Sequence, residues 1–302
     1  MQDFVSRLAV GILPVLLFLV ALIYLDSYKL IKLRWVLLTI ALGGLVAAVP
    51  YGISLVFFER SGLSLASYSR YVAPPIEETV KALLLVYLIR SHRIGFLVDA
   101  AIYGFAVGAG FAVIENLVYL QQLPDSSFVV WLVRGCGTAI MHGGATAIFA
   151  IAAKALSDRD DVPRPLAYLP GLVVAIVVHS AYNHFFLSPI LSTAGILLVL
   201  PPLVFLVFAR SERGLEDWLE VGFDADTELL ALIHSGELSA SKVGRYLEAL
   251  KEGFRGEIVA DLLCYLRIHV ELSLRAKGLL MMRESGFNIE PDEDTRAQFA
   301  EL

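Results

Sequence analysis

The sequence predicts an all-α membrane protein, a polytopic helix bundle followed by a small helical domain. Apolar residues make up 57% of the 302 residues and charged residues only 18%, which is far from the composition of a soluble protein. Apolar runs of about 18 to 25 residues, the length that crosses a bilayer core as a helix, recur over the first two thirds of the chain. We therefore expect a multi-pass integral protein of the cell membrane, in contact with the lipid bilayer.

About seven runs are predicted to span the membrane. The first follows Asp3 and Arg7 and has no small-residue cleavage pattern behind it, so we interpret it as a retained helix and not as a cleaved signal. In the fourth run, Gly104, Gly108 and Gly110 are small enough to let another helix approach closely. The runs cover residues 8–25, 35–58, 71–90, 96–120, 128–155, 166–186 and 190–209.

Orientation follows from the connections, because cytoplasmic loops accumulate lysine and arginine. One set of alternate connections holds only Arg7, Arg60 and Arg70. The other set holds ten such residues, which predicts an outward N-terminus and a cytoplasmic C-terminus: Lys29, Lys32, Arg34, Arg90, Arg93, Lys154, Arg159, Arg164, Arg210 and Arg213.

Two domains are expected, a membrane-embedded domain over residues 1–211 and an acidic cytoplasmic domain over residues 212–302. Residues 210–302 carry 11 Lys/Arg against 19 Asp/Glu, which argues against a nucleic-acid partner. Apolar residues at helical spacing predict helices in this domain, with Asp226 or Ser239 as caps. Its role, regulatory or in binding a cytoplasmic partner, stays open.

Four consecutive predicted spans carry polar residues that a lipid environment should exclude. An ionisable side chain at the bilayer centre costs about 2.5–3.5 kcal/mol on insertion scales, so such residues normally face a protein interior and act there. One of them taken singly, such as Arg134 or Asn183, could be a satisfied bond between helices. Together they can satisfy one another only by converging on a shared site: Glu77, Glu78, Lys81, Glu115, Asn116, Arg134, His142, His179, Asn183 and His184.

Depth along the spans supports one shared level. At a rise of about 1.5 Å per residue, Glu77, Glu78, Glu115, Arg134, His179 and Asn183 lie roughly 5–10 Å below the predicted outer boundary. His142 lies about 21 Å below it on the same rise, which is too deep unless that helix tilts or starts later. The expected site is therefore in the outer half of the membrane, and only the calculated depth of His142 disagrees with this level.

The stretch APPIEETVKALL has a local explanation as well. Proline suits the first turn of a helix, so we expect a helix to restart at Pro75. Glu77 and Glu78 would then lie in its first turn, within reach of Lys81. Taken alone, this segment could be an interfacial helix cap with a salt bridge.

The residue types point to hydrolysis. Two histidines and a carboxylate are the ligands of a catalytic zinc, and Glu115, His142 and His179 fit that set. Either Glu77 or Glu78 could then act as general base on a water molecule. Asn183, one turn after His179, could donate to a developing oxyanion, and Lys81 and Arg134 would keep the carboxylates ionised.

Other mechanisms and functions remain open at this point. A metal-free site, in which a glutamate activates water while His179 and Asn183 polarise a carbonyl, is chemically sound. A transporter or proton-coupled carrier uses similar intramembrane networks, although the internal repeats typical of transporters are not evident. A catalytically silent scaffold that signals through its tail is a third reading.

The order of the motifs resembles the PrsW family of intramembrane proteases. The motifs are Glu77-Glu78-x-x-Lys81, Phe111-x-x-x-Glu115-Asn116, Arg134 followed by His142, and His179-x-x-x-Asn183, over residues 35–190. The chain is more distantly similar to the CAAX prenyl endopeptidase and bacteriocin-processing superfamily, which has histidine in place of Glu115.

The resemblance implies proteolysis in or just outside the membrane, typically the first cut in a membrane-anchored anti-sigma factor during envelope-stress signalling. By motif, it implies that Glu77, Glu78, Glu115, His142 and His179 are the catalytic and metal-binding residues, with Asn183 in support. The expected partner is a single-pass membrane protein substrate, and the expected cofactor is Zn²⁺.

Overall fold

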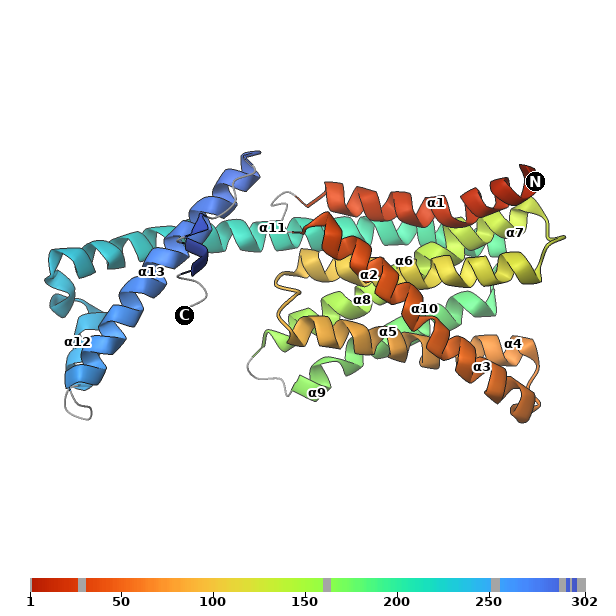
Figure 1. Cartoon of the computed structure of the whole chain (residues 1–302), viewed down its shortest axis with the longest axis horizontal. Coiled ribbons are helices and arrows are strands. Elements are labelled where there is room, and N and C mark those ends of the chain that lie inside the picture. The colour runs from red at the N-terminus through yellow and green to blue at the C-terminus, as the bar shows by residue number, and fades with distance from the viewer. Residues whose placement is uncertain are drawn as a thin grey trace. The chain divides into compact units, whose positions relative to one another are not determined.

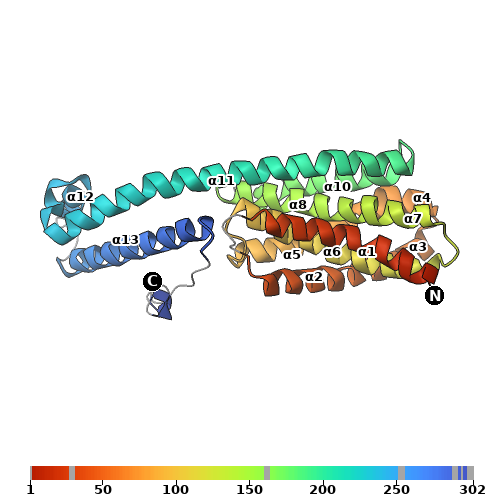
Figure 2. The same ribbon diagram turned by 90° about the horizontal axis from the view of Figure 1, so that it is seen from above.

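The structure, a computed structural model, describes residues 2–26, 31–159, 164–250, 256–287, 292, 293 and 295–297. None of these residues lies in a β-strand, so the all-α prediction is confirmed for the described part of the chain (Figures 1 and 2). In the membrane part the elements are α1 (Gln2–Tyr24), α2 (Leu33–Val46), α3 (Ala48–Ser61), α4 (Leu65–Ser67), η1 (Tyr68–Val72), α5 (Ala73–Arg90), α6 (Leu97–Gln122), α7 (Phe128–Val133), η2 (Arg134–Thr138), α8 (Ala139–Ser157), α9 (Arg164–Ala167) and α10 (Leu169–His184). The remaining elements are α11 (Pro189–Ser235), η3 (Glu237–Ala240), α12 (Lys242–Leu250) and α13 (Gly256–Glu284).

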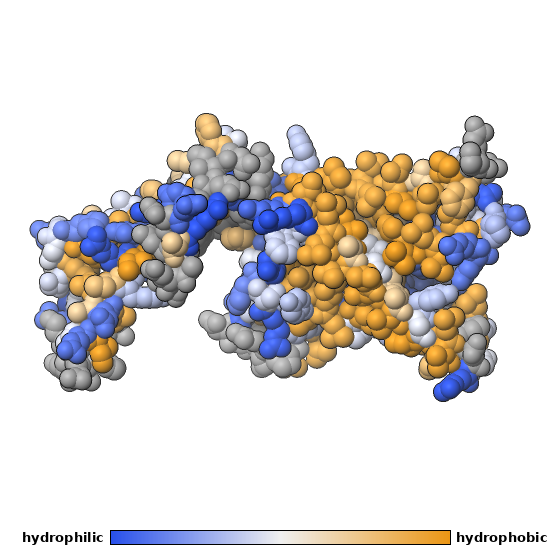
Figure 3. Space-filling view, in the orientation of Figure 1, coloured by the Kyte–Doolittle hydropathy of each residue, from blue (hydrophilic) through white to orange (hydrophobic). Residues whose placement is uncertain are grey.

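Five helical stretches in the described residues are long and apolar enough to cross a membrane. The second of them combines α2 and α3, and the fourth combines α7, η2 and α8. Figure 3 shows apolar side chains over much of the visible face of this bundle, with hydrophilic residues towards both of its ends. The five stretches are Phe4–Tyr24, Leu33–Phe57, Leu97–Gln122, Phe128–Ser157 and Pro189–Ser211. The chain is therefore an integral membrane protein.

The other two predicted spans correspond to α5 and α10, which are not both long enough and apolar enough to meet the criteria that the five stretches meet. Helix α5 has 18 residues but contains Glu77, Glu78, Lys81 and Arg90. Helix α10 has 16 residues, which cover about 24 Å at the helical rise, less than a bilayer core of roughly 30 Å. Both helices contact α8 and each other, so they lie within the bundle. Five of the seven predicted spans are thus confirmed as helices that could cross a membrane.

Helix α6 is the centre of the bundle, and its glycines set its distance from two neighbours. The described part of α6 is buried along most of its length, and it contacts α8, α2 and α1. A Cβ atom added to Gly108 would meet the backbone of His142 on α8, and one added to Gly110 would meet the carbonyl of Ile40 on α2. The predicted packing role of these glycines is confirmed.

We expect Gly108→Ala to destabilise the bundle by about 1–3 kcal/mol, because the new methyl group would push against the backbone at His142, which cannot yield as a side chain can. Gly195→Ala on α11 is the matched control, since nothing lies within 4 Å of the added Cβ atom. Thermal unfolding in detergent should separate the two variants. Equal stability of Gly108→Ala and wild type would contradict this packing.

The chain divides into two compact units, with the main boundary inside α11 between Ser211 and Glu212. In the second unit, Leu238, Leu247 and Val259 form a small core. The predicted caps are wrong: Asp226 lies inside α11, where its carboxylate accepts hydrogen bonds from Ser273 and Lys277 of α13. Ser239 lies within η3, and the hydroxyl of Ser241 accepts the N–H of Gly244 near the start of α12. Tertiary contacts, which local sequence does not reveal, decide the place of Asp226.

Candidate active site

Helices α5, α6, α8 and α10, with the π-helical turn η2, bring the predicted polar residues together in the first unit. All of the predicted site residues except Asn183 and His184 belong to one connected network of ion pairs and hydrogen bonds. His184 instead donates from Nδ1 to the Ser180 carbonyl at 2.7 Å. The network residues lie near the beginning of α5 and towards the ends of α6 and α10, at the end of the bundle that also holds the N-terminus (Figure 1). Convergence on one site is therefore observed.

The most deeply buried part of the network is built around Lys81. Its Nζ atom lies 2.6 Å from Glu78 Oε1 and 3.0 Å from His142 Nδ1, and the Lys81 side chain is 0% exposed. The ammonium also lies 4.4 Å from the centre of the Phe111 ring, within the range of a cation–π contact. The sequence motif contains Phe111 without suggesting this role. Because the ion pair is fully buried, removing either charge would leave the other uncompensated in the protein interior.

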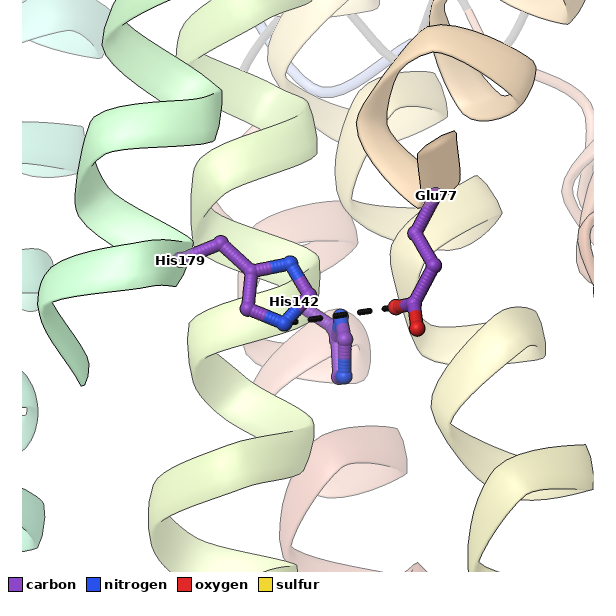
Figure 4. A group of neighbouring side chains, drawn as sticks. All are labelled: Glu77, His142 and His179. Carbon is purple, nitrogen blue, oxygen red and sulfur yellow. Dashed lines mark ion pairs between the residues drawn. The ribbon is translucent and has the colours of Figure 1, made fainter. Parts of the chain in front are cut away.

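Glu77, His142 and His179 form a second group in which three potential metal ligands converge. One ligand atom from each residue lies within 4.8 Å of the other two, and Figure 4 shows the three side chains approaching from α5, α8 and α10. Glu77 Oε2 is buried, has no hydrogen-bond partner among the described residues, and lies 4.0 Å from His179 Nε2. A buried carboxylate oxygen that lacks a hydrogen-bond donor and lies beside two imidazole rings can be satisfied by a divalent cation. The donors therefore fit a metal.

Glu115 lies beside this group without belonging to it. Its Oε2 atom is 3.1 Å from His142 Nε2 and 3.2 Å from an Arg134 guanidinium nitrogen. Its side chain is 24% exposed, against 1% for His142. The ligand set predicted from sequence had Glu115 where the converging group has Glu77.

Arg134 is held in place by neighbours on α6. Its Nε atom donates to Asn116 Oδ1 at 2.8 Å, and its guanidinium carbon lies 3.7 Å from the centre of the Tyr119 ring. Asn116 in turn donates to the carbonyl of Gly11 on α1 at 2.7 Å. Sequence reasoning missed Tyr119, although its place one turn after Glu115 could have indicated it.

The π-helical turn η2 explains how Arg134 and His142 reach the same carboxylate. Eight residues apart in a regular α-helix, they would point about 80° away from each other at roughly 100° per residue. A π-helical turn takes up about one extra residue, which reduces the difference to roughly 20°. Both side chains then contact Glu115 Oε2.

The predicted depth mismatch of His142 has a simple cause. The helical stretch that carries it, Phe128–Ser157, has 30 residues. Such a stretch is about 45 Å long, more than a bilayer core of roughly 30 Å, so depth counted from its first residue is too large. His142 lies with its ring centre 4.6 Å from that of His179.

Hydrogen bonds select one nitrogen of each histidine for a further ligand. Glu78 Oε1 lies 2.8 Å from His179 Nδ1 and accepts a hydrogen bond from the Nδ1–H, which leaves the lone pair on Nε2, the atom that faces Glu77. For His142, the Lys81 ammonium can only donate, so Nδ1 is the acceptor and Nε2–H donates to Glu115. Each imidazole therefore has one carboxylate that orients it, as in many metal sites.

Asn183 lies apart from this network. Its Nδ2 atom donates to the carbonyl of Ser69 at 2.8 Å, and the neighbouring Ser180 hydroxyl donates to the carbonyl of Arg70 at 2.6 Å. The oxyanion role expected for Asn183 remains a prediction. Sequence reasoning missed Ser180, which lies directly after His179.

Comparison with known proteins adds an independent observation. A family model described as PrsW family intramembrane metalloprotease matches residues 32–209, more than half of the chain. The chain belongs to the PrsW family. No curated protein and no solved structure matches it. The PrsW match includes every element that carries the site and leaves out α1. The Gly11 carbonyl of α1 nevertheless accepts a hydrogen bond from the Asn116 side-chain amide.

Membership in the PrsW family establishes the class of activity. PrsW proteins are intramembrane metalloproteases, so the chain is a hydrolase that acts on a membrane protein within the bilayer. The family implies a metal, and the group of Glu77, His142 and His179 offers a place for one. The transporter reading is not favoured.

Proposed function

We propose that this protein is a zinc-dependent endopeptidase that cleaves a single-pass membrane protein near its extracytoplasmic juxtamembrane segment. The convergence of Glu77, His142 and His179 around a carboxylate oxygen without a donor carries the proposal. Two histidines and one carboxylate form a catalytic zinc set that leaves a coordination position open. A membrane-anchored anti-sigma factor in envelope-stress signalling is the substrate class that the sequence resemblance implies.

The proposal includes the topology expected from the sequence. Helices α5 and α10 would complete seven spans, and the ten against three distribution of basic residues supports an outward N-terminus with a cytoplasmic domain over residues 212–302. The site lies at the end of the bundle that holds the N-terminus, which in this topology is the outer half of the membrane. A cut there would separate the extracytoplasmic part of the substrate from its span.

In the proposed mechanism, Glu77, His142 and His179 hold the ion. A bound zinc ion would supply a Lewis acid that polarises the scissile carbonyl and lowers the pKa of water, so that the water is more easily deprotonated for attack. Glu115, the more exposed neighbouring carboxylate, takes the proton of the attacking water and passes it to the leaving amine nitrogen. Arg134, 3.2 Å from Glu115, favours the ionised carboxylate that this step needs.

The buried residues prepare the ligands. Glu78 accepts the Nδ1–H of His179, and Glu115 accepts the Nε2–H of His142. The lone pairs therefore lie on His179 Nε2 and on His142 Nδ1, which accepts a hydrogen bond from Lys81. Lys81 would give up its hydrogen bond to His142 Nδ1 when that atom binds a metal, and would keep its ion pair with Glu78.

Metal analysis of the purified full-length protein tests the proposal. We expect about one zinc ion per chain in the wild type and its loss in folded His142→Ala and His179→Ala variants, with loss of cleavage of a single-span test protein in liposomes. His234→Ala, which changes an exposed histidine of the second unit, is the matched control and should keep zinc and activity. Cleavage by metal-free protein would instead support a glutamate-activated water, and the absence of both zinc and cleavage would overturn the proposal.

A further inference from the structure

The start of α5 has an unusual backbone, because two prolines follow the π-helical turn η1. In a helix, the carbonyl of residue i accepts the N–H of residue i+4, or of residue i+5 in a π-helical turn. For the Arg70 carbonyl, both of these residues are prolines, Pro74 and Pro75, which have no N–H. The Arg70 carbonyl therefore cannot be satisfied by the helix itself.

The neighbouring Ser69 carbonyl is in a similar position. Its possible helical partners are the N–H groups of residues 73 and 74. The N–H of Ala73 donates to the Tyr68 carbonyl, and Pro74 has none. Two consecutive carbonyls thus need donors from elsewhere, since an unpaired carbonyl in a protein interior is costly.

Helix α10 supplies both donors. The Ser180 hydroxyl donates to the Arg70 carbonyl at 2.6 Å, and the Asn183 amide donates to the Ser69 carbonyl at 2.8 Å. The two side chains are three residues apart, so they lie on the same face of α10. Ser180 also directly follows His179, whose ring nitrogens face Glu77 and Glu78 just inside α5.

We infer that Ser180 and Asn183 are positioning residues that clamp the start of α5 to α10 and so place Glu77 and Glu78 against His179. The two hydrogen bonds join the helices immediately before the two glutamates. Metal sites need their ligands held within about 0.5 Å of the productive geometry. The sequence predicted a helix start at Pro75 with both glutamates in its first turn, but α5 begins at Ala73, directly after η1, and its first turn holds no acidic residue. Glu77 and Glu78 lie in the next turn, so their carboxylates move with the start of α5. This role gives a physical reason for a double proline before the two glutamates and for an asparagine one turn after His179.

The inference rests on the proposed metal site for one of its two readouts. The first readout is the affinity for zinc, measured by competition with a chelator, together with the visible spectrum of the cobalt-substituted protein. The second is hydrogen exchange of the backbone amides of residues 68–78 in metal-free protein, which does not depend on the proposed function. Both are measured on the full-length protein in detergent.

We expect Ser180→Ala and Asn183→Ala to lower zinc affinity about 10–100-fold, the usual effect of losing a residue that orients a ligand. They should change the cobalt spectrum and accelerate exchange in residues 68–78. Ser180→Thr, which retains the hydroxyl, should remain close to wild type. Adding Pro74→Ala to Ser180→Ala should restore much of the affinity, because residue 74 then has an N–H that can reach the Arg70 carbonyl.

The outcomes separate the two proposals. Unchanged exchange and zinc affinity in both alanine variants would overturn the clamp, and so would loss of catalysis alone in Asn183→Ala, which would restore the oxyanion role. Failure of Pro74→Ala to rescue Ser180→Ala would overturn the proline explanation. Faster exchange in variants of a wild type that binds no zinc would keep the clamp and remove the metal site.

Discussion

Replacing Glu77 by glutamine should abolish zinc binding and peptide hydrolysis while the protein remains folded. Glutamine has nearly the same shape as glutamate but no negative charge, and its amide is a poor ligand for zinc, which is bound in proteins by cysteine, histidine and carboxylate groups. We expect zinc affinity to fall by more than about 100-fold, beyond the effect of an orienting residue. The buried Oε2 atom has no hydrogen-bond partner among the described residues, so the fold has little to lose.

Glu115→Gln is the informative comparison for that experiment. If Glu115 is the proton acceptor, its loss should lower the rate about 10²–10⁴-fold, while zinc remains bound with an affinity reduced only by the weaker support of His142. Equilibrium dialysis with zinc and single-turnover cleavage separate the two effects. Zinc lost from Glu115→Gln and retained in Glu77→Gln would exchange the two roles and restore the ligand set predicted from sequence.

Replacing Lys81 by methionine should destabilise the protein by about 3–5 kcal/mol, the typical cost of leaving one buried charge without its partner. Lys81 and Glu78 are 0% and 1% exposed in their side chains, and their charged atoms lie 2.6 Å apart. Water cannot reach the remaining carboxylate to compensate it. Unfolding of metal-free protein in detergent provides the measurement.

A second substitution shows whether charge is the cause. Glu78→Gln combined with Lys81→Met removes both charges and keeps an oxygen that can accept the Nδ1–H of His179, so it should recover part of the lost stability. Lys154→Met, which breaks a pair with an Asp158 side chain that is 54% exposed, is the control and should cost about 1 kcal/mol or less. A double variant as unstable as Lys81→Met would exclude the charge explanation and point to packing against Phe111.

The sequence by itself determined the class of fold and most of the residues that belong to the site. Long apolar runs can be satisfied in a bilayer only as helices, because every backbone group must then be paired within its own segment. Charged residues and histidines on neighbouring helices are similarly constrained, since lipid cannot solvate them. These are strong local penalties, so composition and order along the chain were sufficient to find eight residues that share one network.

Only the tertiary structure decided which atoms meet. The π-helical turn η2 brings Arg134 to the helix face that carries His142. No residue pattern in the sequence predicts this turn. Glu77, and not Glu115, forms the converging group with both histidines, since its Oε2 atom on α5 lies 4.0 Å from His179 Nε2 on α10 while Glu115 contacts His142. Asn183 contacts the Ser69 carbonyl, which has no helical partner because the Ala73 N–H bonds Tyr68 and Pro74 has no N–H. Such choices depend on rotations and shifts of about an ångström between packed helices, which the identity and spacing of residues do not encode.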